Sequence, residues 1–150
     1  MRLVLRPARE PPPGALESLG VPVIGYGTDR LPAFYVADSG LKLSMSVHTP
    51  QAAAQVIDCT LALGEHAVVI ANPVPRHAAL SLACVEAWLA RALEEARERG
   101  MQGKALTPFL LGRVAELSEG ASLSANCELL LANAGLAAKI AVALVSLARH

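Results

Sequence analysis

A stretch of the chain that ends at Asn126 constrains the fold most, because it carries start and stop signals for two consecutive helices. Thr107 followed by Pro108 is typical of a helix start. Threonine can accept a hydrogen bond from a free backbone N–H, and proline at the first helical position lacks the N–H that would be unpaired there. Gly120 indicates the end of this helix, and Ser122 can cap a second helix directly after it. The sequence therefore predicts two helices joined by a tight turn.

Asn126 is the candidate substrate-binding residue of this stretch, since it lies near the start of the second helix. The first turn of a helix leaves backbone N–H groups unpaired, so an amide side chain there is well placed to contact a polar ligand. The alternative is that Asn126 only caps its own helix, because asparagine is common at helix starts. The periodicity and the capping signals leave both interpretations open.

Elsewhere, short apolar runs alternate with segments of helical periodicity, which is typical of helices packed on a sheet. We expect strands at Val21–Tyr26, Ala33–Val36 and Ala67–Ala71, a brief strand at Ser46–His48, and helices near 15–19, 50–63, 81–99, 107–119 and 123–148. The continuous apolar run of the Ala67–Ala71 strand predicts that it is covered on both faces. The predicted fold class is α/β: a three-layer α/β/α partial domain with a short sheet and about four helices.

Two of these helices have informative patterns. The helix at 81–99 is amphipathic, and its polar face includes Glu95 and Arg99, which are four residues apart and are expected to pair. The last helix is apolar nearly all round, as expected for a helix that is central in its domain or buried between subunits. Asn133 and Lys139 interrupt it, so we do not expect it to span a membrane.

The composition points to a protein that hides surface in an oligomer or against a partner. Hydrophobic residues make up 53% of the chain and charged residues 17%, and the mean hydropathy is +0.42. The net charge is zero and aromatic residues make up 3%, so neither nucleic acid nor a membrane surface is an expected partner. Residues 1–13 are basic and proline-rich, without a signal-peptide core, and are expected to be a disordered tail before one domain at 14–150. We expect a cytoplasmic location.

Few other residues have a ligand-binding pattern. Asn72 follows the apolar run at 67–71, at the end of a strand where open α/β sheets bind ligands, and is a secondary candidate. The alternative is that Asn72 makes a local turn before Pro73. The three cysteines and four histidines show no metal-ligand spacing, so no metal-binding residue is predicted. The cysteines are expected to be buried and reduced.

Three stretches, in this order along the chain, identify a family. They are G-V-P-V-I-G-Y-G-T-D with L-P-A-F-Y from Gly20 to Tyr35, V-I-A-N-P-V-P from Val69 to Pro75, and T-P-F-L-L-G-R-V-A-E-L with S-L-S-A-N from Thr107 to Asn126. Together they resemble the C-terminal half of the pseudouridine-5′-phosphate glycosidase (indigoidine synthase A-like) family. The resemblance extends from about Ala15 nearly to the end of the chain.

The resemblance implies an enzyme that cleaves the C–C glycosidic bond of pseudouridine 5′-phosphate to uracil and ribose 5-phosphate. Such enzymes use a lysine in an Ala-Gly-Ala-Lys-Ser stretch, a glutamate near the N-terminus and manganese, and they assemble as homotrimers. Pseudouridine 5′-phosphate or uracil is then the implied ligand. Asn126 matches the asparagine that the family uses near the nucleobase.

The chain does not contain the lysine stretch. Its lysines are Lys42, Lys104 and Lys139, none of which lies in that motif, so no catalytic residue is predicted here. We expect manganese only in the complete family enzyme, and none bound by this chain alone. Two hypotheses stay open: a C-terminal portion of a glycosidase that is inactive alone, or an inactive remnant that serves as an oligomerisation or interaction module.

Overall fold

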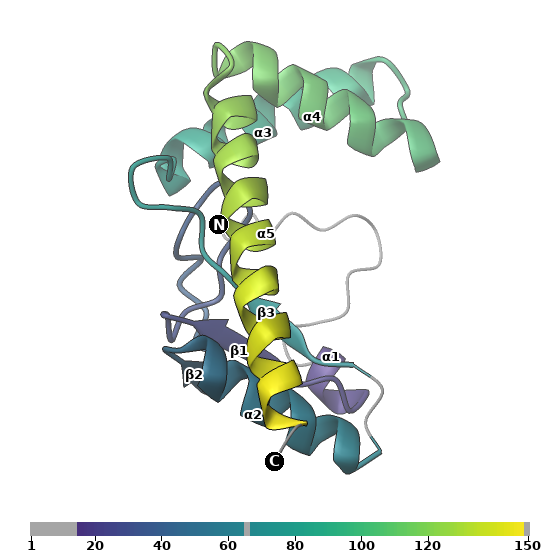
Figure 1. Ribbon diagram of the computed structural model, residues 1–150. Coiled ribbons are helices and arrows are strands. Elements are labelled where there is room, and N and C mark those ends of the chain that lie inside the picture. The colour runs from purple at the N-terminus through teal and green to yellow at the C-terminus, as the bar shows by residue number, and fades with distance from the viewer. Residues whose placement is uncertain (1–14, 65–66, 149–150) are drawn as a thin grey trace.

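A computed structural model describes residues 15–64 and 67–148 (Figure 1). The predicted tail at 1–13 lies outside the described residues. Three strands form a parallel sheet: β1 at Val23–Tyr26, β2 at Met45–Val47 and β3 at Val69–Ala71. β1 is central, in the order β2-β1-β3, and its Ile24 is in register with Met45 of β2 and Ile70 of β3. The predicted partial α/β domain with a short sheet is confirmed.

The helices are α1 at Ala15–Ser18, α2 at Pro50–Ala62, α3 at Leu82–Glu98, α4 at Leu106–Leu117 and α5 at Ala121–Leu147, with a 3-10 turn at Gly103–Ala105 before α4. The start of α2 follows from its sequence. Thr49 Oγ1 accepts a hydrogen bond of 3.1 Å from the Ala52 N–H, and Pro50 occupies the first turn.

The predicted strand at Ala33–Val36 is wrong. Ala33 and Val36 exchange backbone hydrogen bonds of 2.9 and 3.0 Å across a tight turn, and Phe34 adopts a left-handed backbone with φ 54°. The turn places the side chains of Tyr35 and Val36 in a hydrophobic core, which accounts for the apolar run, and these residues are not part of the sheet. A short apolar run alone does not distinguish these two cases.

The connection between α4 and α5 differs from the prediction at both caps. Thr107 lies inside α4, because the 3-10 turn before it lets the helix begin at Leu106, with Ala105 at the N-cap. Ser122 lies inside α5 and does not cap it. Gly120 occupies the N-cap of α5, and the Ser122 N–H donates a hydrogen bond of 3.1 Å to Oγ of Ser118, which is the C-cap of α4.

The turn that ends α4 includes Gly120, as expected, together with Glu119. The Gly120 N–H donates a hydrogen bond of 2.8 Å to the Ala115 carbonyl oxygen, and the Glu119 N–H donates one of 3.0 Å to the Glu116 carbonyl oxygen. These two bonds form a Schellman motif. Glu119 has φ 51° and Gly120 φ 85°, so two successive left-handed residues turn the chain into α5.

α5 extends from α3 and α4 to α2 and the sheet (Figure 1), and it contributes residues to two hydrophobic cores. Its C-terminal part packs along α2 over one face of the sheet, where Ile24, Val47, Ala53 and Ile140 are buried together. Its N-terminal part meets α3 and α4 at a second core, which consists of Tyr35, Val36, Val85, Ala92, Val114 and Ala125. Burial raises the pKa of Tyr35 there, while a hydrogen bond with the Ser122 hydroxyl acts in the opposite direction.

The three cysteines are exposed, so the prediction that they are buried is wrong. Cys59, Cys84 and Cys127 lie on α2, α3 and α5, on the sides of these helices that face away from the two cores. The predicted double coverage of β3 is also not found in the described structure, because Val69 is 37% exposed. By length and composition alone α5 could cross a membrane, although Ile140 and Ala143 are buried against the rest of the chain.

Candidate functional site

An open groove of about 660 Å³ lies between β3, α2, α5 and the loop around Pro32. Its lining is apolar except for two amide side chains, those of Asn72 and Asn133. The other lining residues are Leu31, Pro32, Phe34, Ile57, Val68, Ile70, Ala71, Leu129, Leu136, Ala137, Ile140, Ala141 and Leu144. An apolar concave surface with a few convergent polar groups is the usual form of a ligand site.

The two amides contact each other across the groove. Asn72 Nδ2 donates a hydrogen bond of 2.9 Å to Asn133 Oδ1. Asn72 directly follows β3, at the carboxyl end of the sheet, and Pro73 keeps the residue before it in an extended conformation. The bond uses one donor and one acceptor of the pair, so the Asn72 carbonyl oxygen and further N–H groups on both side chains can still bind a ligand.

The loop after Asn72 runs along α5 toward the N-terminal end of that helix. Val74 is buried, and His77 Nε2 lies 3.4 Å from Glu128 Oε2 on α5. The Asn72–Asn133 bond and the His77–Glu128 contact hold the loop at two points along the helix. These contacts fix the loop on α5 beyond Asn72, the last residue of this segment that lines the groove.

Asn126 lies in the second turn of α5 and is half-buried. The alternative that it caps its own helix is wrong, because Gly120 occupies the N-cap. Asn126 is not among the residues that line the groove. It precedes Asn133 by two helical turns on the same side of α5, about 10 Å along the axis at a rise of about 1.5 Å per residue. Its role near a nucleobase stays a prediction.

Sequence reasoning found Asn72 but missed Asn133. The Asn72 side chain contacts α5, and the predicted alternative of a local turn before proline is not tested by this contact. The sequence analysis interpreted Asn133 only as a polar residue that interrupts an apolar helix. Its spacing of seven residues from Asn126 was the available signal, since that spacing puts two amides on one side of a helix.

The lysines do not contribute to the groove. Lys42, Lys104 and Lys139 are exposed, and none of them lines it. Within residues 15–64 and 67–148, no cluster of three His, Cys, Asp or Glu side chains could hold a metal ion. The described residues therefore do not fit a manganese site.

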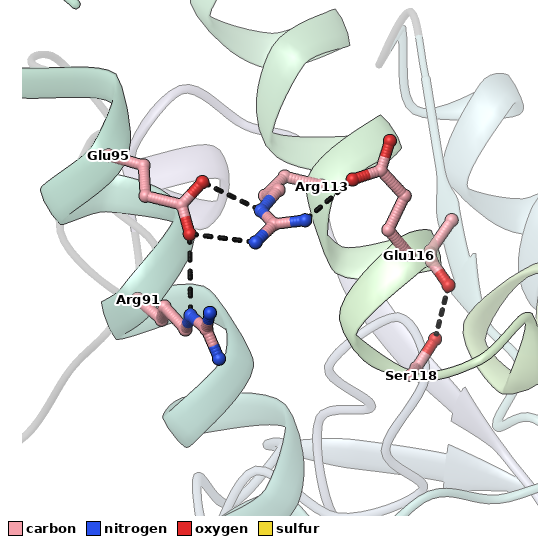
Figure 2. A network of polar contacts seen from close by, with 6 residues as sticks. Arg91, Glu95, Arg113, Glu116 and Ser118 are labelled. Carbon is pink, nitrogen blue, oxygen red and sulfur yellow. Dashed lines mark hydrogen bonds and ion pairs between the residues drawn. The ribbon is translucent and has the colours of Figure 1, made fainter.

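The strongest electrostatic contacts lie away from the groove and join α3 to α4 (Figure 2). Arg113 binds both carboxylate oxygens of Glu95, with distances of 2.7 and 2.9 Å, and also reaches Glu116 at 2.6 Å. Arg91 adds a bond of 3.3 Å to the same Glu95 carboxylate. The hydrogen bonds that Arg113 donates lower the pKa of Glu95, and the same bonds, accepted by Glu95 and Glu116, raise the pKa of Arg113.

This network corrects the predicted pairing of Glu95 with Arg99. Glu95 turns toward α4, and the Arg99 guanidinium lies over the Phe109 ring, 5.3 Å from its centroid. A bidentate partner on a neighbouring helix is a stronger contact than a single exposed pair on the same helix. The network holds two helices together and contains no group that is free for catalysis.

Comparisons with known proteins agree with the motifs. The family described as Indigoidine synthase A like protein matches residues 14–143. The chain is 50% identical over 129 residues to a pseudouridine-5′-phosphate glycosidase of Staphylococcus aureus, which covers 85% of this chain and 42% of that protein. The corresponding enzyme of Streptomyces griseus is 46% identical over 130 residues, with 85% and 40% covered.

Two solved structures share the fold. The prealnumycin C-glycosynthase, crystallised with ribulose 5-phosphate, superposes with a TM-score of 0.83 at 32% identity, over 89% of this chain and 44% of that one. An indigoidine synthase A-like protein of Thermotoga maritima superposes with a TM-score of 0.75 at 32% identity, over 86% and 42%.

The chain spans about two fifths of the length of the curated relatives it matches. That share is consistent with the C-terminal half of such proteins. The matched region nonetheless includes the whole sheet, every groove-lining residue except Leu144, and most of α5. The chain therefore belongs to the indigoidine synthase A-like family.

Proposed function

We propose that this chain forms the nucleobase-binding portion of a pseudouridine-5′-phosphate glycosidase, which cleaves a C–C glycosidic bond to give uracil and ribose 5-phosphate. The observation that carries the proposal is the 50% identity to such an enzyme over 85% of the chain. The groove supports it, because it reaches Asn72 at the carboxyl end of the sheet, where open α/β sheets bind ligands.

The chemistry divides between this chain and the rest of the domain. A carbon leaving group needs an electron sink, which an iminium between a lysine and the opened sugar supplies. The described residues offer no lysine at the groove, so that step belongs to the remainder. The part of this chain is to bind the base: Asn126 contacts an edge of the uracil ring, and the apolar groove wall excludes water.

The ligand class has a second support. The solved prealnumycin C-glycosynthase is in complex with ribulose 5-phosphate, a sugar phosphate of the size that the proposed reaction releases. Manganese, which the resemblance implies, would be held by residues of the remainder, because the described residues do not fit it. A cytoplasmic location is a further part of the proposal, supported by relatives that are bacterial enzymes. A homo-oligomer is also part of it, and the exposed apolar residues of α5 support it.

The test is a fusion protein in which this chain replaces the matched 129 residues of the Staphylococcus aureus relative. We expect uracil release from pseudouridine 5′-phosphate. Asn126→Ala should lower kcat/KM about tenfold or more, because leaving a base edge unpaired costs about 1–3 kcal/mol. Ser124→Ala, at an exposed position on the same helix, is the matched control and should keep full turnover.

A folded fusion protein that releases no uracil would count against the glycosidase proposal. It would favour the alternative of an inactive interaction module. Full activity of the Asn126→Ala variant would instead remove Asn126 alone from the site and leave the reaction assigned.

A further inference from the structure

Phe34 is the aromatic residue of the groove. The other described residues that line it carry aliphatic or amide side chains. Phe34 is 43% exposed, whereas Tyr35, the next residue, is 8% exposed. The centroids of the two rings lie 4.1 Å apart. Phe34 therefore keeps part of its surface open to the groove after its ring has packed on Tyr35.

The backbone at Phe34 is unfavourable for a phenylalanine. Phe34 is the first central residue of the turn from Ala33 to Val36, and its φ of 54° lies in the left-handed region. Glycine is the usual residue at such a position, because a bulky side chain crowds the backbone there. Conformations of this kind persist only where the surrounding structure holds them, and they cluster at ligand sites. Local preference therefore does not explain the phenylalanine.

The rest of the turn packs into a core, and Phe34 does not. Tyr35 and Val36 are buried in the core to which α3, α4 and α5 contribute, and Ala33 packs against that core. The Tyr35 carbonyl oxygen also accepts a hydrogen bond of 2.8 Å from the Leu80 N–H. The core thus fixes the other three residues of the turn, and the side chain of Phe34 is left at the groove.

Buried hydroxyl groups fix the ring of Tyr35. The Tyr35 hydroxyl forms a hydrogen bond with the side chain of Ser122 on α5. Ser122 is 1% exposed, and its Oγ lies at a hydrogen-bond distance of 3.1 Å from Oγ of Ser118, the C-cap of α4. The Tyr35 ring cannot move without breaking these bonds, so it holds the Phe34 ring beside it. A side chain that is ordered before its ligand arrives loses less entropy on binding.

We propose that Phe34 stacks on the face of the nucleobase in the groove, where the turn and the Tyr35 ring hold it in position. The inference rests on the proposed function, which brings a uracil ring to this groove. Amide side chains can bond the polar edges of that ring, but its faces need a flat apolar partner. Stacking on an aromatic side chain provides such a partner. A binding role for the ring also explains why an unfavourable backbone is kept at this position.

The charge of the groove favours the base over the phosphate of the ligand. Among the described residues that line the groove there is no Lys, Arg or His, and no Asp or Glu. A phosphate needs cationic partners or converging backbone N–H groups. An uncharged ring needs neither, so the base is the part of the ligand that suits the wall formed by Phe34.

The first experiment titrates the purified chain with uracil and follows the two ring C–H protons of uracil by NMR. Stacking predicts an upfield shift, because the ring current of Phe34 shields protons above its face. Phe34→Leu keeps an apolar side chain without a ring current, so it should abolish the shift and weaken binding about fivefold or more. Phe109→Leu is the matched control and should keep the shift, because the chain's other phenylalanine lies on α4 outside the groove lining.

Dihydrouracil is the matched ligand. It keeps the polar groups of uracil, but its ring is saturated and puckered and therefore stacks poorly. The unmodified chain should bind uracil more tightly than dihydrouracil, and Phe34→Leu should reduce this preference. A preference that Phe34→Leu leaves unchanged would contradict stacking on this residue.

A stability measurement separates binding from packing. Phe34→Gly removes the ring and supplies a residue that adopts positive φ freely, so the Tm of the chain should stay level or rise while uracil binding weakens. A clearly lower Tm together with unchanged uracil binding would show that the Phe34 ring only packs on Tyr35. That result would overturn the proposal.

The same titration of the fusion protein described above adds the rest of the domain and requires no turnover. A Phe34-dependent shift in a fusion protein that releases no uracil would support the stacking and count against the glycosidase proposal alone. Absence of an upfield shift in both proteins would overturn the stacking proposal. Equal uracil binding by Phe34→Leu and the unmodified protein would also overturn it.

Discussion

At the scale of single residues, Gly25 is a position with no room for a side chain. A Cβ atom there would lie 2.1 Å from the Thr28 carbonyl oxygen and 3.0 Å from Leu43 Cδ1. The chain turns back on β1 directly after Tyr26, so that backbone cannot move without opening the sheet. The glycine is required for the close approach of two backbone segments, next to the loop that contributes Leu31 and Phe34 to the groove.

We therefore expect Gly25→Ala to destabilise the protein by about 3 kcal/mol, the upper part of the usual range for overpacking. Gly112→Ala is the control, because Gly112 lies in α4 with open space at its Cβ. It should stabilise the protein by about 0.5–1 kcal/mol, since alanine loses less freedom in a helix. Urea unfolding of both variants measures the two changes. Similar stability for both variants would show that the turn after β1 can move to make room for the added methyl group.

The same scale shows why the site could be predicted only in part. Asn72 was found because a strand followed by Asn-Pro is a local pattern, and its position at the sheet edge follows from topology. Its contact with Asn133 joins residues 61 apart in sequence. A local sequence pattern does not predict a contact between residues so far apart in the chain. The groove is likewise a product of how α5 lies over β3, which the periodicity of α5 does not specify.

At the scale of elements, the helices were predicted better than the turns between them. α2 carries its own cap and first-turn proline, and the prediction of its start was right. The start of α4 was misplaced by the 3-10 turn before it, and the end of α4 uses Glu119 as well as Gly120. Glu95 was assigned a partner on its own helix, but packing of α3 on α4 brought the better donor, Arg113.

The Glu95–Arg113 contact makes a pH prediction possible. Because Arg113 lowers the pKa of Glu95 in the folded state, the contact stabilises the fold above the ordinary glutamic acid pKa of about 4.3. That stabilisation is lost as the pH falls through the lowered pKa. Glu95→Gln should therefore lose less stability between pH 5 and pH 3 than the unmodified chain. Urea midpoints at both pH values measure this, with the exposed Glu94→Gln as control.

An equal loss for Glu95→Gln and the unmodified chain would mean that solvent screens the pair. Glu95 and Arg113 keep 20% and 24% of their side chains exposed, so part of the attraction is screened already. The direction of the change is the measurable result, and it reports specifically on the α3–α4 contact.

At the scale of the whole molecule, the three sequence motifs predicted the family, and the family match over residues 14–143 confirms it. The match covers about two fifths of the curated relatives, and within the described residues Val69 of β3 and several apolar residues of α5 are exposed. The apolar residues, which make up 53% of the chain, therefore lie on exposed surfaces as well as in the two cores. Composition alone could not separate these two.

The last prediction is that this chain alone does not cleave pseudouridine 5′-phosphate. Catalytic groups that act as a unit lose nearly all their effect when one is removed. Here the groove has neither a lysine to form the iminium nor a carboxylate to transfer protons, and the described residues offer no metal cluster. Asn72, Asn126 and Asn133 can bind a polar ligand, but amides supply no electron sink for a carbon leaving group.

The measurement incubates the purified chain with substrate and manganese, follows uracil release, and attempts borohydride trapping of a sugar adduct. We expect neither product nor adduct, and we expect uracil release once the remainder of the domain is supplied. The fusion protein is the positive control under the same conditions. Turnover by the chain alone, with an adduct on Lys42, Lys104 or Lys139, would contradict the prediction. It would also mean that an exposed lysine reaches the groove by a rearrangement of α5 or of the loop around Lys42.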